Sequence, residues 1–260
     1  MALHKYWKTM MMMATSYIGD SPLFLLDYLL RFLRVVVLLA IWRLILVHDA
    51  SISMSLEEVL TYTLIAEVFS AQLAVRTRLD LMFWEGSIIG KMLQPLGLFR
   101  QFTAEMCGKW LFEGALFSLP LLLCSPLLGV DPRPANLAAF GLFVISLLLA
   151  ISVGLALDFI FNALLVIYAL PLWAISQIRS AVITLLSGAM IPLALLPESV
   201  GNALAWLPFA SMASAPLQLY VGTGEPISLI GLQIGWSIVL WPLAHWLWYI
   251  SRERMLSYGG

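Results

Sequence analysis

The stretch that decides the fold is residues 136–170, NLAAFGLFVISLLLAISVGLALDFIFNALLVIYAL, in which Asp158 is the only charged side chain. The hydrocarbon core of a bilayer is about 30 Å thick, and an α-helix crosses it with about 20 mostly apolar residues. The stretch exceeds that minimum, so it predicts one membrane-spanning helix that is tilted or broken. The alternative is that residues 158–179 form a separate span.

The whole chain is similarly apolar. Of its 260 residues, 62% are hydrophobic and only 11% are charged, and the mean hydropathy is +0.94. A soluble domain usually carries about a quarter charged residues, so 14 Lys+Arg and 15 Asp+Glu cannot give this chain a water-soluble surface. A soluble enzyme and a disordered chain are therefore excluded. The net charge of −1 argues against a nucleic-acid partner, and the lipid bilayer is the expected surrounding.

Five further apolar runs are long enough to span a bilayer. Together with residues 136–170 they predict an all-α integral membrane protein with six transmembrane helices, folded as a single domain over residues 1–260. The five runs are 25–47, 56–75, 108–128, 176–196 and 227–250.

Positive charges predict the orientation of these spans, because Lys and Arg accumulate in cytoplasmic segments. With both termini in the cytoplasm, all of the 14 Lys+Arg residues except Arg43 and Arg133 lie on or near the cytoplasmic side. An arrangement with seven spans would place Arg252 and Arg254 outside. The charges therefore favour six spans with cytoplasmic N- and C-termini.

Three segments are expected to lie beside the spans. Residues 4–18 carry lysines, aromatic residues and a run of methionines, which predicts an N-terminal interfacial helix, with a partly disordered tail as the alternative. Residues 84–100 predict a short amphipathic cytoplasmic helix that docks onto a soluble partner or, alternatively, lies flat on the membrane. Residues 197–224 are apolar but interrupted by proline and glycine, which predicts an outer re-entrant hairpin between spans five and six.

Some polar side chains fall inside the predicted spans, where burial is costly unless the group is paired or functional. Glu67 lies near the middle of the second span, and Asp158 and Asn162 lie one turn apart in the fourth. All three are candidates for a translocation path. A structural contact with another helix is the alternative, and for Glu67 so is a proton-coupling site. Glu113 is expected to pair with Lys109, one turn away.

No constellation in the sequence predicts catalysis by this chain. Residues 86–92, GSIIGKM, are one residue short of a phosphate-binding loop and end in Met92, where a magnesium-holding Ser or Thr is needed. Ser187 and His245 leave an intramembrane hydrolase as an alternative, although a packing role explains each of them more simply. A secondary transporter is a further alternative that no internal repeat supports. No metal-ligand set can be assembled from the three scattered histidines.

Two sets of motifs resemble the ABC-2 family of export permeases, especially its six-span subunits that pair with a separate ATPase. The first set comprises residues 186–192 (LSGAMIP), 196–197 (LP), 207–211 (LPFAS), 215–216 (AP) and 220–222 (YVG). The second set comprises Glu85 and Gly86 with residues 93–96 (LQPL), in which Gln94 stands where arginine is common in this family. The resemblance covers nearly the whole chain.

The resemblance implies a function and a set of functional residues. The chain would be the permease subunit of an ATP-driven exporter in the plasma (inner) membrane of a prokaryote, with no cofactor and no enzymatic activity of its own. Its partners would be two ATPase subunits, which hold ATP and magnesium, and a second permease subunit, similar or identical. The cargo would be a hydrophobic or amphipathic molecule.

The same resemblance assigns two groups of residues. The coupling helix that meets the ATPase would contain Glu85, Gly86, Lys91, Gln94 and Pro95. The outer re-entrant gate would contain Pro192, Pro197, Pro208, Phe209 and Pro216.

Overall fold

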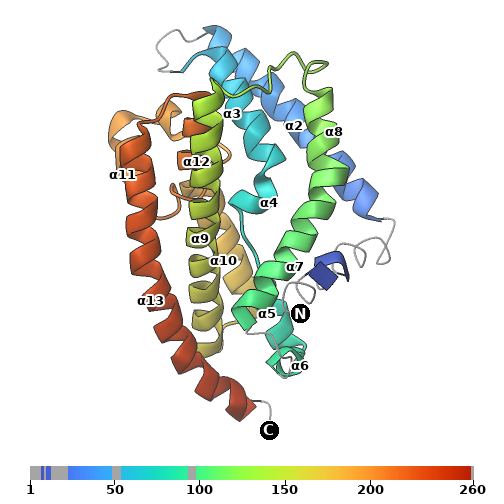
Figure 1. Ribbon diagram of the computed structural model, residues 1–260, viewed down its shortest axis with the longest axis vertical. Coiled ribbons are helices and arrows are strands. Elements are labelled where there is room, and N and C mark those ends of the chain that lie inside the picture. The colour runs from blue at the N-terminus through green and yellow to red at the C-terminus, as the bar shows by residue number, and fades with distance from the viewer. Residues whose placement is uncertain (1–6, 9, 13–22, 49–53, 93–97, 259–260) are drawn as a thin grey trace.

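The computed structural model describes residues 7–8, 10–12, 23–48, 54–92 and 98–258, and these residues form helices and loops without any β-strand (Figure 1). The fold is therefore all-α, as predicted. Gln94 and Pro95 of the predicted coupling helix lie outside the described residues, as does most of the predicted interfacial helix.

Three stretches of helix within the described residues are long and apolar enough to cross a membrane. α9 (Leu137–Ile167) corresponds to the fourth predicted span and α13 (Pro226–Tyr258) to the sixth. The third stretch, Gln101–Cys124, corresponds to the third predicted span. It is built from α7 (Leu98–Glu113), a π-helical turn η1 (Gly114–Ser118) and α8 (Leu119–Cys124).

The other three predicted spans differ from a continuous apolar helix. The first carries more charged residues, the second is broken, and the fifth ends before its predicted boundary. α2 (Leu23–His48) matches the first predicted span but carries three arginines. The second begins with a capping box at Ser55, runs as α3 (Leu56–Val68), and breaks at Phe69 before the four-residue helix α4 (Ser70–Leu73). α10 (Leu172–Leu186) ends before the predicted boundary at residue 196, because Gly188 adopts a left-handed φ of 75°. The count of six spans stays a prediction.

Short helices lie at both ends of the bundle. α5 (Leu79–Trp84) and α6 (Ile88–Met92) lie at the end that also contains the C-terminal part of α13, which we call the α6 end (Figure 1). The connection from α10 to α13 contains a 3-10 turn and two helices, and we call its end of the bundle the α11 end. Its elements are η2 (Leu193–Leu195), α11 (Glu198–Ala205) and α12 (Ser214–Val221).

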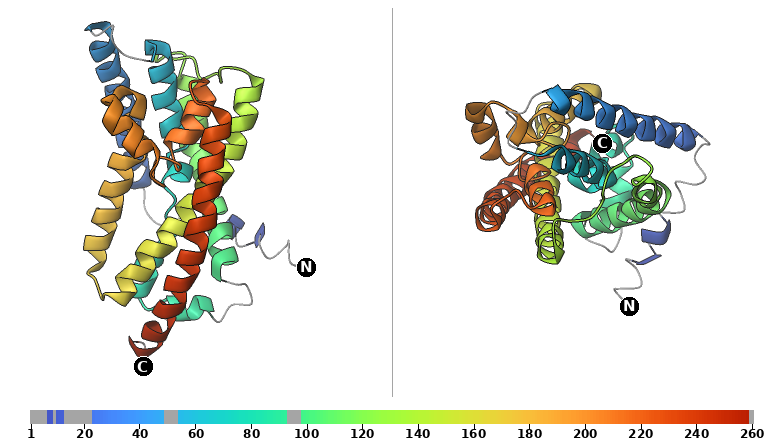
Figure 2. Two further views of the ribbon diagram at one scale, coloured as in Figure 1. Left: turned by 90° about the vertical axis from the view of Figure 1, so that its left-hand side faces the viewer. Right: turned by 90° about the horizontal axis from the view of Figure 1, so that it is seen from above.

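α9 makes the most extensive helix–helix contacts in the described part of the bundle. It packs most extensively on α13 and α12, and over shorter stretches on α4, α5 and α10 (Figure 2). One hydrophobic core joins α2, α3, α8 and α12 around Tyr62, and a second joins α5, α7, α9 and α13 around Phe159. The first core also contains Phe143 of α9, so both cores contact this helix.

The outer faces of the helices are apolar as well. Large aliphatic side chains that are more than half exposed include Leu29 of α2, Leu123 of α8, Leu148 of α9 and Ile238 of α13. An exposed apolar surface of this extent is unusual for a water-soluble protein. It is compatible with contact to lipid acyl chains.

The connection between α10 and α13 returns into the interior of the bundle. α12 is almost wholly buried, and Met212, in the loop that precedes it, is fully buried. The Met212 Cε methyl lies 3.1 Å from the position of a Cβ at Gly154, near the middle of α9. The Tyr62 hydroxyl of α3 donates a hydrogen bond to the Gly188 carbonyl at 2.7 Å. The connection is thus held between α3, α9 and the end of α10.

We expect Gly154→Ala to destabilise the bundle. An added Cβ would lie 2.9 Å from Val75 Cγ2 and 3.1 Å from Met212 Cε, so these packed neighbours would have to shift, and overpacking typically costs about 1–3 kcal/mol. Gly141→Ala on the same helix is the matched control, because nothing lies within 4 Å of its Cβ position. The measurement is the melting temperature of the purified protein in detergent, and an equal effect of the two substitutions would contradict the close packing at Gly154.

Candidate functional site

The predicted coupling segment forms an exposed corner at the α6 end. α5 ends at Trp84 with Glu85 as its C-cap, Gly86 adopts a left-handed φ of 68°, and α6 begins at Ile88. Glu85 and Gly86 are both exposed, and nothing lies within 4 Å of the Cβ position at Gly86. A larger side chain at Gly86 would meet no steric obstacle, but it would strain the backbone. We call Glu85 and Gly86, with α5 and α6, the corner.

Lys91 of the corner makes its contact inside the chain. Its ammonium forms an ion pair with Glu105 of α7 and lies 5.5 Å from the centroid of the Phe102 ring. Gln101 Nε2 donates a hydrogen bond to the same carboxylate at 3.1 Å, and both Gln101 and Glu105 are buried. Lys91 therefore attaches α6 to α7, which the sequence did not indicate. Its contact with an ATPase stays a prediction.

Glu67 forms an ion pair with α2. Its Oε2 lies 2.5 Å from a guanidinium nitrogen of Arg34. One turn before Arg34 on α2, Arg31 donates a hydrogen bond to Ser70 Oγ at 2.7 Å. The Arg31 guanidinium also lies 4.2 Å from the centroid of the Phe117 ring in η1. These contacts join α2 to α3, α4 and η1. They correspond to the alternative interpretation of Glu67, in which its carboxylate makes a structural contact with another helix. Its place in a translocation path stays a prediction.

Asp158 lies in a buried polar cluster between α9, α10 and the segment before α5. It is 1% exposed, and its Oδ1 lies 2.9 Å from an Arg179 guanidinium nitrogen. Its Oδ2 accepts hydrogen bonds from the Thr77 backbone N–H, at 3.1 Å, and from the Thr77 hydroxyl. Arg179 also donates to the Val75 carbonyl, and Asn162 Nδ2 donates to the Asp158 carbonyl at 2.7 Å. We call these five residues the Asp158 cluster.

The Asp158 cluster fixes the segment between α4 and α5 to α9 and α10. Its two charges are paired and hydrogen-bonded, as buried charges must be if the fold is to tolerate them. The sequence singled out Asp158 and Asn162 but missed Arg179 and Thr77. Arg179 is the only charged residue in α10. A single charge in an otherwise uncharged helix was the sequence feature that could have indicated a pair with Asp158. Whether Asp158 and Asn162 also contribute to a translocation path stays a prediction.

The predicted outer-gate residues are spread along the connection between α10 and α13. Pro192 and Pro197 precede η2 and α11, Pro208 and Phe209 lie in the turns that follow α11, and Pro216 is buried in α12. Of these five, all within the described residues, only Pro197 lines the adjoining cavity of about 910 Å³. This cavity separates the connection from α2, and its wall also contains Trp42, Ile45 and Gln218.

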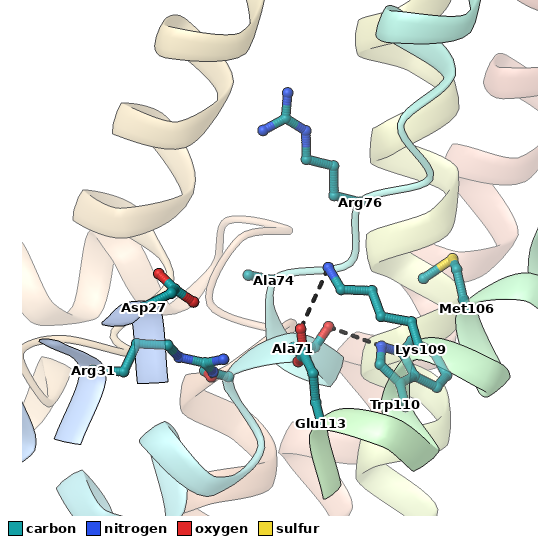
Figure 3. Close-up of a pocket in the computed structure, with 10 residues that line it drawn as sticks. Asp27, Arg31, Ala71, Ala74, Arg76, Met106, Lys109, Trp110 and Glu113 are labelled. Carbon is teal, nitrogen blue, oxygen red and sulfur yellow. Dashed lines mark hydrogen bonds and ion pairs between the residues drawn. The ribbon is translucent and has the colours of Figure 1, made fainter. Parts of the chain in front are cut away.

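A more polar site lies beside α2, where two adjoining cavities of about 290 and 660 Å³ open. Figure 3 shows the smaller of the two. Asp27, Arg76, Lys109 and Glu113 line both cavities. The pair of Lys109 and Glu113 that the sequence predicted is present, with a distance of 3.6 Å between the ammonium nitrogen and the nearest carboxylate oxygen. Asp27 and Arg76 come from two other parts of the chain, so no local pattern linked them to this pair.

The contacts of Ser187 and His245 are not those of a nucleophile with its base. Ser187 is fully buried, and its Oγ accepts a hydrogen bond from the Ala189 N–H at 3.3 Å. His245 is exposed on α13, and its Nδ1 lies 2.8 Å from the Trp241 carbonyl oxygen one turn earlier. Within the described residues, no group of three or more His, Cys, Asp or Glu side chains could hold a metal ion.

The sequence model of a known family, described as "ABC-2 family transporter protein", matches residues 32–259. The match extends from α2 to the end of the described part of α13. The chain belongs to the ABC-2 transporter family. It is thus a membrane protein of a transport family, as the motifs between residues 186 and 222 indicated. No curated protein matched the chain.

We expect Arg179→Met to destabilise the protein strongly, because it leaves the buried Asp158 carboxylate without its ion-pair partner. Removal of one partner from a buried pair typically costs about 3–5 kcal/mol. The double substitution of Asp158→Asn with Arg179→Met removes both charges and should recover much of that loss. The measurement is the melting temperature of the single and double variants in detergent. A double variant no more stable than Arg179→Met would show that the two side chains are not coupled.

Proposed function

We propose that the chain is the permease subunit of an ATP-driven exporter that is energised by separate ATPase subunits. In this proposal the six spans are α2, α3 with α4, α7 with α8, α9, α10 and α13. They cross the plasma (inner) membrane of a prokaryote, with both termini and the α6 end in the cytoplasm. The connection between α10 and α13 is the outer re-entrant hairpin. ATP and magnesium are held by the partner, and this chain contributes no ATPase site.

The observation that carries the proposal is the exposed corner at Glu85 and Gly86 in a chain of the ABC-2 transporter family. Two buried polar contacts attach this corner to the helices. The ion pair of Lys91 with Glu105 joins α6 to α7, and the Asp158 cluster joins the segment before α5 to α9 and α10. A displacement of the corner would therefore move three long helices rather than being absorbed by a loop.

This attachment suits a helix bundle whose conformation is changed by ATP binding and hydrolysis in a partner subunit. ATP binding can do work on the bundle only by favouring one packing of its helices over another. A corner that is exposed on one side and fixed to α7, α9 and α10 on the other provides a mechanical route for that bias. A second permease subunit, similar or identical, would complete the transport path, to which Glu67, Asp158 and Asn162 are the candidate contributors.

The proposed cargo is a hydrophobic or amphipathic small molecule or a lipid-like molecule. Support comes from the cavity of about 910 Å³ at the α11 end, whose wall is mainly aliphatic and contains Ile45, Leu193 and Leu195 beside the polar side chains of Glu198 and Gln218. Cavities of this kind, apolar with a few polar groups, are typical of small-molecule sites. Its position next to Pro197 would place it on the release side of the exporter.

Affinity purification of the tagged chain in mild detergent, followed by mass spectrometry, tests the proposal. We expect an ABC ATPase subunit to copurify in an amount equal to that of the permease subunits, and the purified complex to hydrolyse ATP. A chain that purifies without an ATPase and transports in response to an ion gradient would instead be a secondary transporter.

Gly86→Val is expected to uncouple the corner without unfolding the bundle. A residue with a Cβ at a left-handed φ costs about 1–2 kcal/mol, which changes a conformational equilibrium by a factor of roughly 5–30. Gly90→Ala in α6 is the matched control, because Gly90 is exposed, has no atom within 4 Å of its Cβ position and does not have a positive φ. The measurement is the ATPase rate of the complex in lipid nanodiscs relative to the ATPase subunit alone.

We expect this stimulation to fall severalfold in Gly86→Val and to stay unchanged in Gly90→Ala. Equal stimulation by both variants would show that the corner does not couple the ATPase to the permease.

A further inference from the structure

The two adjoining cavities beside α2 contain charges of both signs. Arg31 lines only the smaller cavity, and Arg78 and Asp80 line only the larger one. The four residues that line both are two acids, Asp27 and Glu113, and two cations, Arg76 and Lys109. They come from three elements that surround the smaller cavity in Figure 3, namely α2, the extended segment after α4, and α7. Opposite charges on facing walls make a site that is complementary to a ligand carrying both signs.

The charges are only partly satisfied by one another. Arg76 forms a close pair with Asp80 at 2.6 Å, but Lys109 lies 3.6 Å from Glu113. Within the described residues, the second carboxylate oxygen of Glu113, Oε2, is buried without a hydrogen-bond partner. The exposed Asp27 carboxylate likewise has no ion pair among the described residues. The exposed Asp27 carboxylate therefore offers an acceptor for a cation, and the loosely paired Lys109 ammonium offers donors for an anion.

Two of these four charged residues lie within a stretch of helix that is long enough to cross a membrane. Lys109 and Glu113 belong to Gln101–Cys124, a stretch apolar enough to span a membrane. Ionisable side chains at such positions are costly, and they usually line a water-filled cavity or bind a charged group. The π-helical turn η1 begins directly after Glu113, and π-helical turns within α-helices are frequent at functional sites.

The helix that borders the site is strongly apolar on its exposed surface. Leu25, Leu26, Leu29, Leu30 and Leu33 of α2 are each more than half exposed, and they flank Asp27 and Arg31 in the sequence. A ligand whose charged part occupies the cavities therefore has an aliphatic helix surface beside it. A charged cavity beside an exposed aliphatic surface favours a ligand with acyl chains over a small soluble zwitterion.

We propose that these cavities bind the headgroup of a zwitterionic phospholipid. Arg76 and Lys109 hold its phosphate by charge-assisted hydrogen bonds, Asp27 and Glu113 hold its ammonium, and its acyl chains lie along the exposed leucines of α2. This site goes beyond the exporter function. Binding to the isolated chain needs no ATPase, so a failure of this proposal would leave the result of the affinity purification unaffected.

The test measures the melting temperature of the purified full-length chain in detergent against the concentration of dihexanoyl phosphatidylethanolamine. Three further probes separate the contributions: dihexanoyl phosphatidylglycerol lacks the ammonium, phosphoethanolamine lacks the acyl chains, and inorganic phosphate lacks both. We expect saturable stabilisation by the phosphatidylethanolamine. The apparent affinity should be roughly tenfold weaker for the phosphatidylglycerol and for phosphoethanolamine, which each lose one contribution, and roughly a hundredfold weaker for inorganic phosphate, which loses both.

Each other outcome of this titration overturns the proposal. Equal affinity for the phosphatidylglycerol would show that no ammonium is recognised. Equal affinity for phosphoethanolamine or for inorganic phosphate would identify a site for a soluble ion. An absence of saturable stabilisation by the phosphatidylethanolamine would show that the cavities hold no headgroup.

Two substitutions locate the binding site. Asp27→Asn removes the proposed ammonium partner from an exposed position that has no ion pair within the described residues, so the melting temperature without lipid should not change while the affinity for the phosphatidylethanolamine falls severalfold. Asp131→Asn is the matched control, because this carboxylate is exposed in the loop between α8 and α9, outside both cavities. Lys109→Gln should weaken lipid binding because it removes a proposed contact to the phosphate. If this variant fails to fold, the affinity of Asp27→Asn is the measurement that tests the site. Unchanged affinity in Asp27→Asn, or in a folded Lys109→Gln, would overturn the assignment.

Discussion

The arrangement of the α6 end depends on a pair of opposite charges buried in an apolar bundle. Neither Asp158 nor Arg179 could be buried alone without a large cost in free energy. Besides their ion pair, Asp158 accepts hydrogen bonds from Thr77 and Arg179 donates one to the Val75 carbonyl. This requirement holds residues 75–77 out of a helix and against α9 and α10. The second predicted span therefore stops before it reaches the α6 end, and α5 and α6 form a separate corner beneath the long helices.

The same short segment links the corner to the charged cavities. Side chains in an extended backbone point alternately to opposite sides, and here Val75 and Thr77 are buried while Arg76 between them is exposed and lines both cavities. A ligand that binds Arg76 and a partner that moves the corner would thus act on adjacent residues. The proposed lipid site and the proposed coupling route share one structural element.

Hydropathy was sufficient to locate the long helices but not their breaks. α9 and α13 match the predicted ranges closely at their N-terminal ends, because the length of an apolar run directly limits the length of the helix it can form. The end of α10 has a local signal in Gly188. At the break after α3, by contrast, the carbonyls of Val68 and Ala71 accept hydrogen bonds from Ser118 and Trp110, which come from a distant part of the chain. The pair of Lys109 and Glu113 could be predicted because it lies within one helix. The partners of Glu67, Lys91 and Asp158 could not, because each comes from another element.

The π-helical turn in the third long helix sets the relative orientation of its two halves. A π-helical turn accommodates one more residue than the α-helix it interrupts, and each residue of an α-helix rotates the next by about 100°. Loss of a single residue from Gly114–Ser118 would leave the helix continuous, but it would turn Lys109 and Glu113 by about that angle relative to the face that α8 packs on α3. The composition and hydropathy of the span would hardly change, yet its charged side chains would face a different neighbour. Small insertions and deletions at this point of the chain can therefore alter the polar site while the membrane-crossing helix stays intact.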